Sequence, residues 1–123
     1  MKKLLILAAA VFLSSFAFAE REFDIDGPVE QHVRISAKAG QEAEFEQTFA
    51  GVFYPALSSQ NGFLGAALLR KPGTSDYVIR LAFATEELRT AWVHSDAHET
   101  AWPKLAVYAG EPTWEGLSLR HPK

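Results

Sequence analysis

Residues 63–84 read FLGAALLRKPGTSDYVIRLAFA, and this stretch has the clearest local pattern in the chain. Two apolar runs, residues 63–71 and 77–84, flank the polar segment Pro72-Gly73-Thr74-Ser75-Asp76. Apolar segments of strand length on either side of a short turn with Gly and Pro are typical of a β-hairpin. The sequence therefore predicts two antiparallel strands in the middle of the chain.

Upstream of this hairpin, the pattern predicts a strand followed by a helix. Polar and apolar residues alternate from residue 31 to 37, as in a half-buried strand, and Gly40 ends the alternation. From residue 41 the apolar side chains recur at helical spacing, at Phe45, Phe49, Val52 and Phe53. We expect Pro55 to bend or weaken this helix before a loop that ends at residue 62.

Downstream of the hairpin, the pattern predicts two short helices and a last strand. Thr85 is a suitable N-cap for a helix that stops near His94. Asp96 and Glu99 have the spacing of a capping box that starts a second helix, in which Pro103 predicts a kink or a new turn. Residues 113–119 form the last predicted strand.

The order of these elements is strand, helix, strand, strand, helix, strand. It predicts an α+β fold of the ferredoxin-like βαββαβ type, in which helices cover one face of an antiparallel sheet. We find no internal repeat or linker, so residues 30–119 are expected to form one domain behind a charged leader at residues 20–29.

The first nineteen residues have the composition of a secretory signal peptide. Lys2 and Lys3 precede an apolar run to Leu13, and the small residues Ala17 and Ala19 fit the cleavage rule. We predict cleavage after Ala19 and a periplasmic or secreted protein, with an uncleaved membrane anchor as the alternative. No second apolar run could span a bilayer, so we expect no membrane association after cleavage.

Composition excludes several classes of function. Removing residues 1–19 removes two lysines and no acids, which leaves ten Lys and Arg against fifteen Asp and Glu, a formal net charge of −5. The basic residues are scattered, so we expect no nucleic-acid partner. The chain has no cysteine, and no motif of a hydrolase, nucleotide-binding protein or glycosidase stands out. Because a small domain without disulfides buries little surface, we expect a dimer.

Three separated segments resemble the antibiotic biosynthesis monooxygenase family. They are HVRI at 32–35 together with KAGQEAEFE at 38–46, QNGFLG at 60–65, and WVHSDAH at 92–98 with Trp102. The resemblance spans roughly residues 30–119 and implies a dimeric α+β barrel, in which two sheets pack face to face and each subunit of the homodimer keeps a pocket between sheet and helices. The functions of the members of this family include oxygenation of polycyclic aromatic quinols without a cofactor, degradation of heme and other reactions.

The resemblance disfavours the heme-degrading branch. Those members carry an Asn on the first strand, and His32 and Val33 stand at that place here. The family's heme-ligating His would fall near Trp102. We therefore expect no cofactor.

His94 and His98 have the spacing of two metal ligands on a helix, with Asp96 and Glu99 beside them. Two ligands four residues apart converge only on one continuous helix, and Ser95-Asp96 reads as a helix start between them. We therefore predict no metal site, and His94 reads better as a solvated loop residue.

His98 is the candidate catalytic residue, because it shares a helical stripe with Trp102 and Leu105 and should face the sheet. An oxygenase without a cofactor needs a base and a dry aromatic cavity for a small hydrophobic or aromatic ligand. The candidates for the lining are Trp92, Trp102, Phe53, Tyr54 and Tyr108, with core packing as the alternative for all of them.

Two further polar residues are candidates for substrate binding. His32 lies on the strand face opposite Val33, where it would reach either the pocket or a subunit interface, and Arg80 is polar within an apolar strand. Arg80 could pair with a substrate carboxylate, although an ion pair with an acidic side chain is the more ordinary use. The sequence leaves two main hypotheses open: an exported cofactor-independent monooxygenase acting on a small aromatic or quinol-like compound, and a non-catalytic dimeric module that binds a small hydrophobic ligand.

Overall fold

The computed structural model describes residues 21–121. The predicted signal peptide, residues 1–19, therefore lies outside the described residues. The elements follow in the order β1 (Val29–Ser36), α2 (Glu42–Thr48), a π-helical turn η1 (Phe49–Phe53), α3 (Tyr54–Ser58), β2 (Phe63–Arg70), β3 (Asp76–Phe83), α4 (Glu86–Val93), α5 (Asp96–Ala106) and β4 (Thr113–Ser118).

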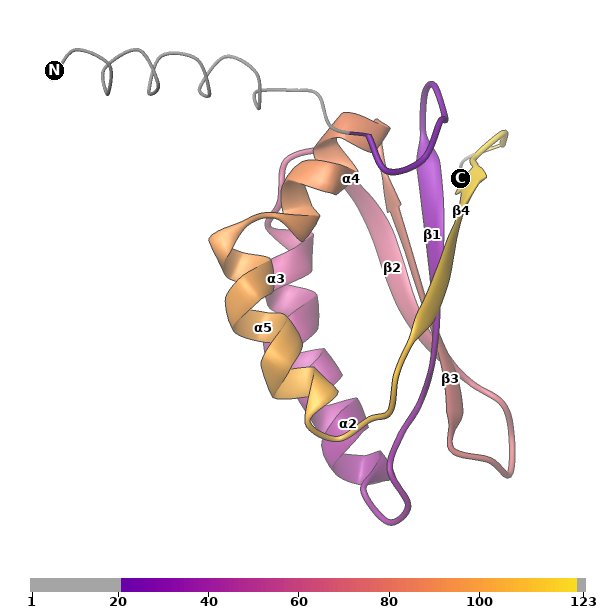
Figure 1. The fold of residues 1–123 in the computed structure, drawn as a ribbon, viewed down its shortest axis with the longest axis vertical. Helices are drawn as coiled ribbons and strands as arrows, with labels where there is room; N and C mark the ends of the chain where they lie inside the picture. Colours follow the sequence, from indigo (N-terminus) through magenta and orange to yellow (C-terminus); the bar gives the residue numbers. More distant parts are fainter. Residues whose placement is uncertain (1–20, 122–123) are drawn as a thin grey trace, which may run out of the picture.

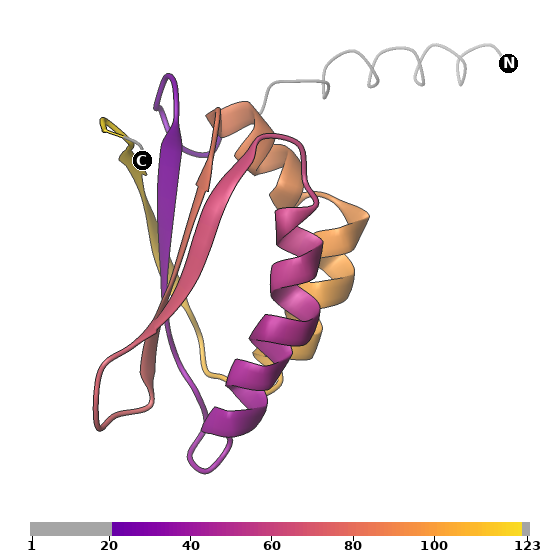
Figure 2. The ribbon, with the colours of Figure 1, turned by 180° about the vertical axis from the view of Figure 1, so that it is seen from behind.

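The strands form one antiparallel sheet in the order β2-β3-β1-β4. All helices lie on one face of this sheet, and its other face carries no further layer within the described chain (Figure 1; Figure 2). This arrangement confirms the prediction of an α+β, ferredoxin-like fold with an antiparallel sheet. The central hairpin is also confirmed, with β2 and β3 paired in register from Arg70–Tyr77 to Gly65–Ala82.

Alternation along β1 divides the sheet into a buried and an outer face. Val29, Gln31, Val33 and Ile35 are buried beneath the helices, whereas the residues between them are half-buried or exposed on the outer face. Burial of the apolar side of each strand against the helices supplies the main stabilising term of the fold. The residues of the core lie between the two layers.

The first helical segment runs without a break from residue 42 to 58 but changes its geometry in the middle. Its π-helical turn, η1, ends two residues before Pro55, which takes an early position in α3. The proline has no N–H and its ring crowds the carbonyl of the preceding turn, so a wider turn relieves both problems. The predicted weakening at Pro55 is therefore present as a local change of helix type.

The second helical region is divided into α4 and α5 where the sequence indicated, but the N-cap of α5 differs from the prediction. The Thr85 hydroxyl accepts a hydrogen bond from the N–H of Leu88 and caps α4, as expected. The cap of α5 is Ser95, whose hydroxyl accepts from the N–H of His98, so the predicted capping box at Asp96 is wrong by one residue. Helix α5 also continues through Pro103, without a new start there.

The leader is not a loose extension, although residues 21–28 form no helix or strand. The Phe23 ring lies against Gly116 of β4, where an added Cβ would meet the ring at 2.3 Å. The Phe23 N–H also donates to the carboxylate of Glu86, at 2.8 Å. The glycine at position 116 thus provides the space in which the leader packs onto the sheet and α4.

Candidate functional site

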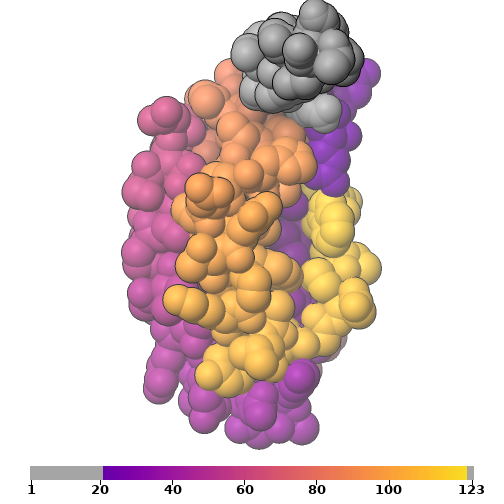
Figure 3. All heavy atoms as spheres, turned by 60° about the vertical axis from the view of Figure 1, so that its left-hand side comes forward, coloured from indigo at the N-terminus to yellow at the C-terminus, as the bar shows by residue number. Residues whose placement is uncertain are grey.

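A cavity of about 330 Å³ lies between the helices and the sheet. That volume falls at the lower end of the roughly 300–1,000 Å³ typical of ligand pockets. Figure 3 shows α5 and β4 side by side on the surface, with indigo atoms of the N-terminal part of the described chain visible between them. The lining residues are Glu22, Gln31, Val33, Phe53, Ile79, Leu81, Trp92, Val93, His98, Trp102, Glu111, Pro112 and Trp114.

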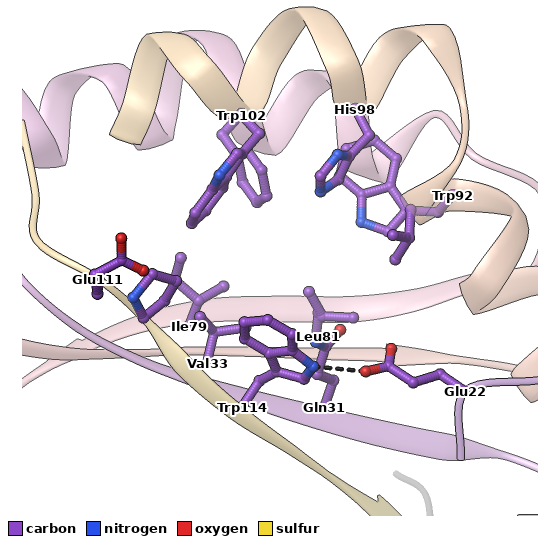
Figure 4. A pocket seen from close by; sticks show the side chains of 13 residues that line it. Glu22, Gln31, Val33, Ile79, Leu81, Trp92, His98, Trp102, Glu111 and Trp114 are labelled. Atoms are coloured by element: carbon purple, nitrogen blue, oxygen red, sulfur yellow. Dashed lines mark hydrogen bonds between the residues drawn. The ribbon is translucent and has the colours of Figure 1, made fainter. Parts of the chain in front are cut away.

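The helices cover the cavity with aromatic rings (Figure 4). Phe53 comes from η1, Trp92 from α4, and His98 and Trp102 from α5. The ring centroids of Trp92 and His98 are 4.8 Å apart, and the rings of His98 and Trp102 are nearly parallel, with 14° between their planes. Phe53 packs edge-on against Trp92, with centroids 5.6 Å apart. The four residues form one continuous surface facing the sheet.

His98 is held in this surface as a neutral imidazole near pH 7. Burial lowers the pKa of His98 from its usual 6.5, and the neighbouring His94 lowers it further. The polar contact of His98 in the described structure is made by its backbone N–H, which donates to Ser95. Among residues 21–121 no side chain or backbone group hydrogen-bonds to the imidazole ring, so its unprotonated nitrogen can accept a proton from a guest molecule.

The sheet supplies the opposite wall (Figure 4). Val33, Ile79 and Leu81 contribute aliphatic side chains, and all three are buried. Val33 pairs with Ile79 on one side and with Trp114 on the other, so the register places the Trp114 indole beside the aliphatic floor. Trp114 is 50% exposed, which marks β4 as the side on which the cavity opens.

One end of the cavity is built from a polar network that is buried at Arg89, Glu86 and Gln31 and reaches the surface at Glu22. The Arg89 guanidinium donates to both carboxylate oxygens of Glu86, at 2.8 and 2.9 Å, and neither side chain is exposed. Arg89 also donates to Gln31, at 3.0 Å, and to Glu22, at 2.8 Å. The second oxygen of Glu22 accepts from the Trp114 indole, at 2.6 Å. Glu22 and Gln31 belong to this network and also line the cavity.

Charge pairing keeps Glu86 and Arg89 ionised despite their burial. Burial raises the pKa of Glu86, but hydrogen bonds from Arg89 and the Phe23 N–H outweigh that effect and leave the pKa below its usual 4.5. Burial likewise lowers the pKa of Arg89, whereas its hydrogen bonds to Glu86 and Glu22 outweigh that effect and raise the pKa above its usual value. The Phe23 ring covers the guanidinium, 4.3 Å from the ring centroid.

The structure brings four of the eight predicted site residues together. His98, Trp92, Trp102 and Phe53 all line the cavity. Tyr54 follows the π-turn and is 37% exposed, with its ring against Phe49 and Phe63. Tyr108 lies in the turn after α5, partly buried against the core and outside the lining.

The two polar candidates on the sheet are on its outer face, away from this cavity. His32 and Glu30 form a hydrogen bond of 2.7 Å, and Arg80 lies 3.8 Å from the same carboxylate. Neither lines the cavity, because both occupy outward positions in the alternation of β1 and β3. The ion pair weighed for Arg80 from the sequence is therefore present.

Sequence reasoning missed nine of the thirteen lining residues, and among these Glu22, Gln31, Glu111 and Trp114 carry polar groups. Gln31 could have been found, since it shares the phase of Val33 and Ile35 in β1. Glu22 meets Arg89 across 67 positions and Trp114 across 92, and no local pattern carries that information.

No set of three or more His, Asp or Glu side chains within residues 21–121 is arranged to hold a metal ion. His94 ends α4 and His98 lies in the first turn of α5, as the sequence indicated. In the same part of the chain, no helix has both the length and the apolar character needed to cross a bilayer.

Comparison with known proteins identifies the fold and the family. SnoaB, a cofactor-independent oxygenase from Streptomyces nogalater, is 20% identical and superposes with a TM-score of 0.69, covering 77% of this chain and 95% of that one. The NE2512 protein of Nitrosomonas europaea, of unknown function, is 26% identical with a TM-score of 0.67, covering 79% and 93%. No curated protein sequence matches. The family model for antibiotic biosynthesis monooxygenase matches residues 28–104, and the chain therefore belongs to that family.

Proposed function

We propose that this protein is an exported, homodimeric monooxygenase that acts without a cofactor on a small aromatic or quinol-like compound. The observation that carries the proposal is the position of His98, a neutral imidazole in the aromatic wall of a 330 Å³ cavity. An oxygenase of this kind needs a base beside a substrate that itself reduces dioxygen, in a site that excludes most water.

In the proposed reaction the substrate supplies all the electrons. His98 takes a proton from an acidic O–H or C–H group, and the resulting anion transfers one electron to dioxygen. The substrate radical and superoxide combine to a peroxide, which takes the proton back from His98. Loss of water from a peroxide-bearing carbon that also carries hydrogen leaves a carbonyl. One oxygen atom stays in the product, the other leaves as water, and His98 returns to its neutral form.

The cavity walls suit a flat ligand. Trp102 and His98 on the helix side face Val33 and Trp114 on the sheet side, so a planar ring fits between them (Figure 4). Aromatic contacts of this type contribute about 0.5–1.5 kcal/mol beyond area burial. The known activity of SnoaB, a cofactor-independent oxygenase of the same fold, supports the same reaction class here.

Oxygen uptake measured with a panel of quinols tests this function. We expect turnover by the wild-type protein and a loss of about 100-fold or more in the His98→Ala variant, the usual range for a general base. His121→Ala is the matched control, since His121 is exposed and does not line the cavity. Quinol binding without oxygen uptake by any of the three proteins would contradict the proposal and favour the non-catalytic binding module.

The proposed homodimer uses the outer face of the sheet. Leu64, Leu69 and Leu117 are between 41% and 51% exposed, and the register of β2 and β4 places Leu69 and Leu117 beside the outward residues of β1 and β3. An apolar surface of this kind is typical of an interface. Light scattering should give twice the monomer mass, and Leu69→Lys should shift it toward the monomer. A wild-type monomer at micromolar concentration would refute the dimer.

Export is proposed from the composition of residues 1–19. The predicted cleavage after Ala19 leaves Glu20 as the first residue, directly before the segment that packs on α4 and β4. N-terminal sequencing of protein from the periplasmic fraction should therefore begin at Glu20. Recovery of the whole chain with Met1 from the cytoplasm would contradict export.

A further inference from the structure

The cavity that is proposed to hold the substrate has two acidic side chains in its lining. The carboxylates of Glu22 and Glu111 line it from two sides (Figure 4). Within residues 21–121 no lysine or arginine lines the cavity. An anionic ligand would find no positive partner on these walls, whereas a cation would find two carboxylates.

The nearest cation, Arg89, does not reverse this balance. Its guanidinium has no exposed surface and is bonded to the carboxylates of both Glu86 and Glu22. Two carboxylates share one guanidinium, so the cluster keeps a formal charge of −1 before Glu111 is added. His98 contributes no positive charge, because burial holds its pKa below the usual 6.5.

Four aromatic rings share the remaining wall with aliphatic side chains, and they favour the same kind of ligand. Phe53, Trp92, Trp102 and Trp114 all line the cavity. The face of an aromatic ring, of tryptophan above all, attracts cations, and the effect strengthens where water is excluded. A binding site that combines aromatic rings with carboxylates is a typical environment for an organic ammonium group.

Glu22 is the best-placed partner for such a group. Its two oxygens are fixed by the donors of Arg89 and Trp114, at 2.8 and 2.6 Å. A carboxylate offers about four acceptor sites, so each oxygen can accept a further hydrogen bond from a ligand. Glu22 and Glu111 are both exposed at the rim of the cavity, but only Glu22 is held by hydrogen bonds from side chains of the described residues.

We propose that the substrate of this site carries a protonated amine beside its aromatic ring, and that Glu22 is the residue that selects for it. This inference rests on the proposed function for the ring chemistry and deepens it by naming the substrate class. The ring lies between the Trp102 and Trp114 sides of the cavity, near His98, while the ammonium group donates to Glu22. A compound with a carboxylate at the same place is rejected.

Three matched hydroquinones test the charge preference. 2-(2-Aminoethyl)hydroquinone, 2-(2-hydroxyethyl)hydroquinone and 2,5-dihydroxyphenylacetate share one ring and differ in the charge of the side chain. Binding is measured under argon by quenching of tryptophan fluorescence, so turnover plays no part. We expect the ammonium compound to bind about tenfold more tightly than the neutral one, and the carboxylate at least about tenfold more weakly.

Charge-neutral variants locate the effect. In Glu22→Gln, which keeps an acceptor for Arg89 or Trp114, the preference for the ammonium compound should fall to about threefold or less, with little change for the neutral compound. Glu115→Gln is the matched control, since Glu115 lies on β4 next to Trp114 but pairs with Arg34 on the outer face. If Glu22→Gln does not fold, the wild-type protein is tested at increasing salt concentration instead. The preference for the ammonium compound should then decrease, because salt screens the attraction between the ammonium group and the carboxylate.

The outcomes separate this inference from the proposed function. Equal affinities for the three compounds, or the tightest binding for the carboxylate, overturn the charge preference even if oxygen uptake is observed. An unchanged preference in Glu22→Gln overturns the role of Glu22. Tight binding of the ammonium compound without oxygen uptake by the wild-type protein upholds the inference and refutes the oxygenase. Binding of none of the compounds refutes both.

Discussion

The buried ion pair between Arg89 and Glu86 is the part of the site whose removal should change the stability most. We consider Arg89→Met, which replaces the guanidinium by an apolar side chain of comparable length. Glu86 has no exposed side-chain surface, so its carboxylate would remain in the interior with only the Phe23 N–H and the Thr90 hydroxyl as donors. A buried charge without its partner is strongly unfavourable.

The expected cost follows from the geometry of the pair. Breaking a fully buried pair by removing one partner costs about 3–5 kcal/mol. The Arg89 guanidinium donates four hydrogen bonds, to Glu86, Gln31 and Glu22, and all are lost. Because a domain has a total stability of about 5–15 kcal/mol, the loss is a large share of it. For about a hundred residues it corresponds to a fall in Tm of roughly 15 °C or more.

Urea unfolding monitored by circular dichroism, with the double variant Glu86→Leu/Arg89→Met, measures this cost. The double variant leaves neither charge in the interior, and we expect it to regain at least about half of the loss. A loss below about 1 kcal/mol in Arg89→Met, or a double variant as unstable as the single one, would refute the reasoning that an unpaired buried charge dominates.

Three further predictions concern pH and backbone geometry. The pKa of His98 is lowered on folding, so the contribution of His98 to the free energy of unfolding should be complete above pH 6.5 and should decline as the pH falls below that value. When the free energy of unfolding is measured at a series of pH values, His98→Asn should remove this decline. Burial and the hydrogen bond to Glu46 raise the pKa of Tyr77 to about 12, so ultraviolet titration should show one tyrosine ionising late, and Tyr77→Phe should remove that step. Gly62 has φ +82°, and an added Cβ there would lie 2.5 Å from Leu88 Cδ1, whereas Gly73 has φ +77° with open space around it. Gly62→Ala should therefore lower the free energy of unfolding by about 2 kcal/mol more than Gly73→Ala. Equal urea midpoints for the two variants would contradict this.

The parts of the fold that were predictable are those set by local patterns. The hairpin at residues 63–84 has its turn chemistry and both apolar runs in one segment, and it forms as predicted. The stripe of His98, Trp102 and Leu105 needs only helical spacing to face the sheet, and Leu105 is fully buried there. The position of His98 in the cavity could therefore be inferred before any coordinates, whereas its catalytic role stays a prediction.

The remainder of the site depends on contacts that local patterns do not encode. Tyr54 was expected in the lining of the pocket, but it directly follows Phe53 in the helical segment, so it faces another direction and packs on Phe63. Glu22 reaches the cavity only because Phe23 fits over Gly116 and Arg89 lies beneath the leader. These contacts join segments far apart in the chain, so neither spacing nor composition indicated them.

A crystal structure of the protein with a bound hydroquinone, prepared without oxygen, would show whether the substrate binds in the cavity beside His98. We expect electron density for a flat ring between the aromatic rings of α5 and the sheet, with a hydroxyl within hydrogen-bonding distance of the His98 imidazole. Side chains that fill this cavity, or a ligand bound elsewhere with His98 turned to solvent, would contradict the account.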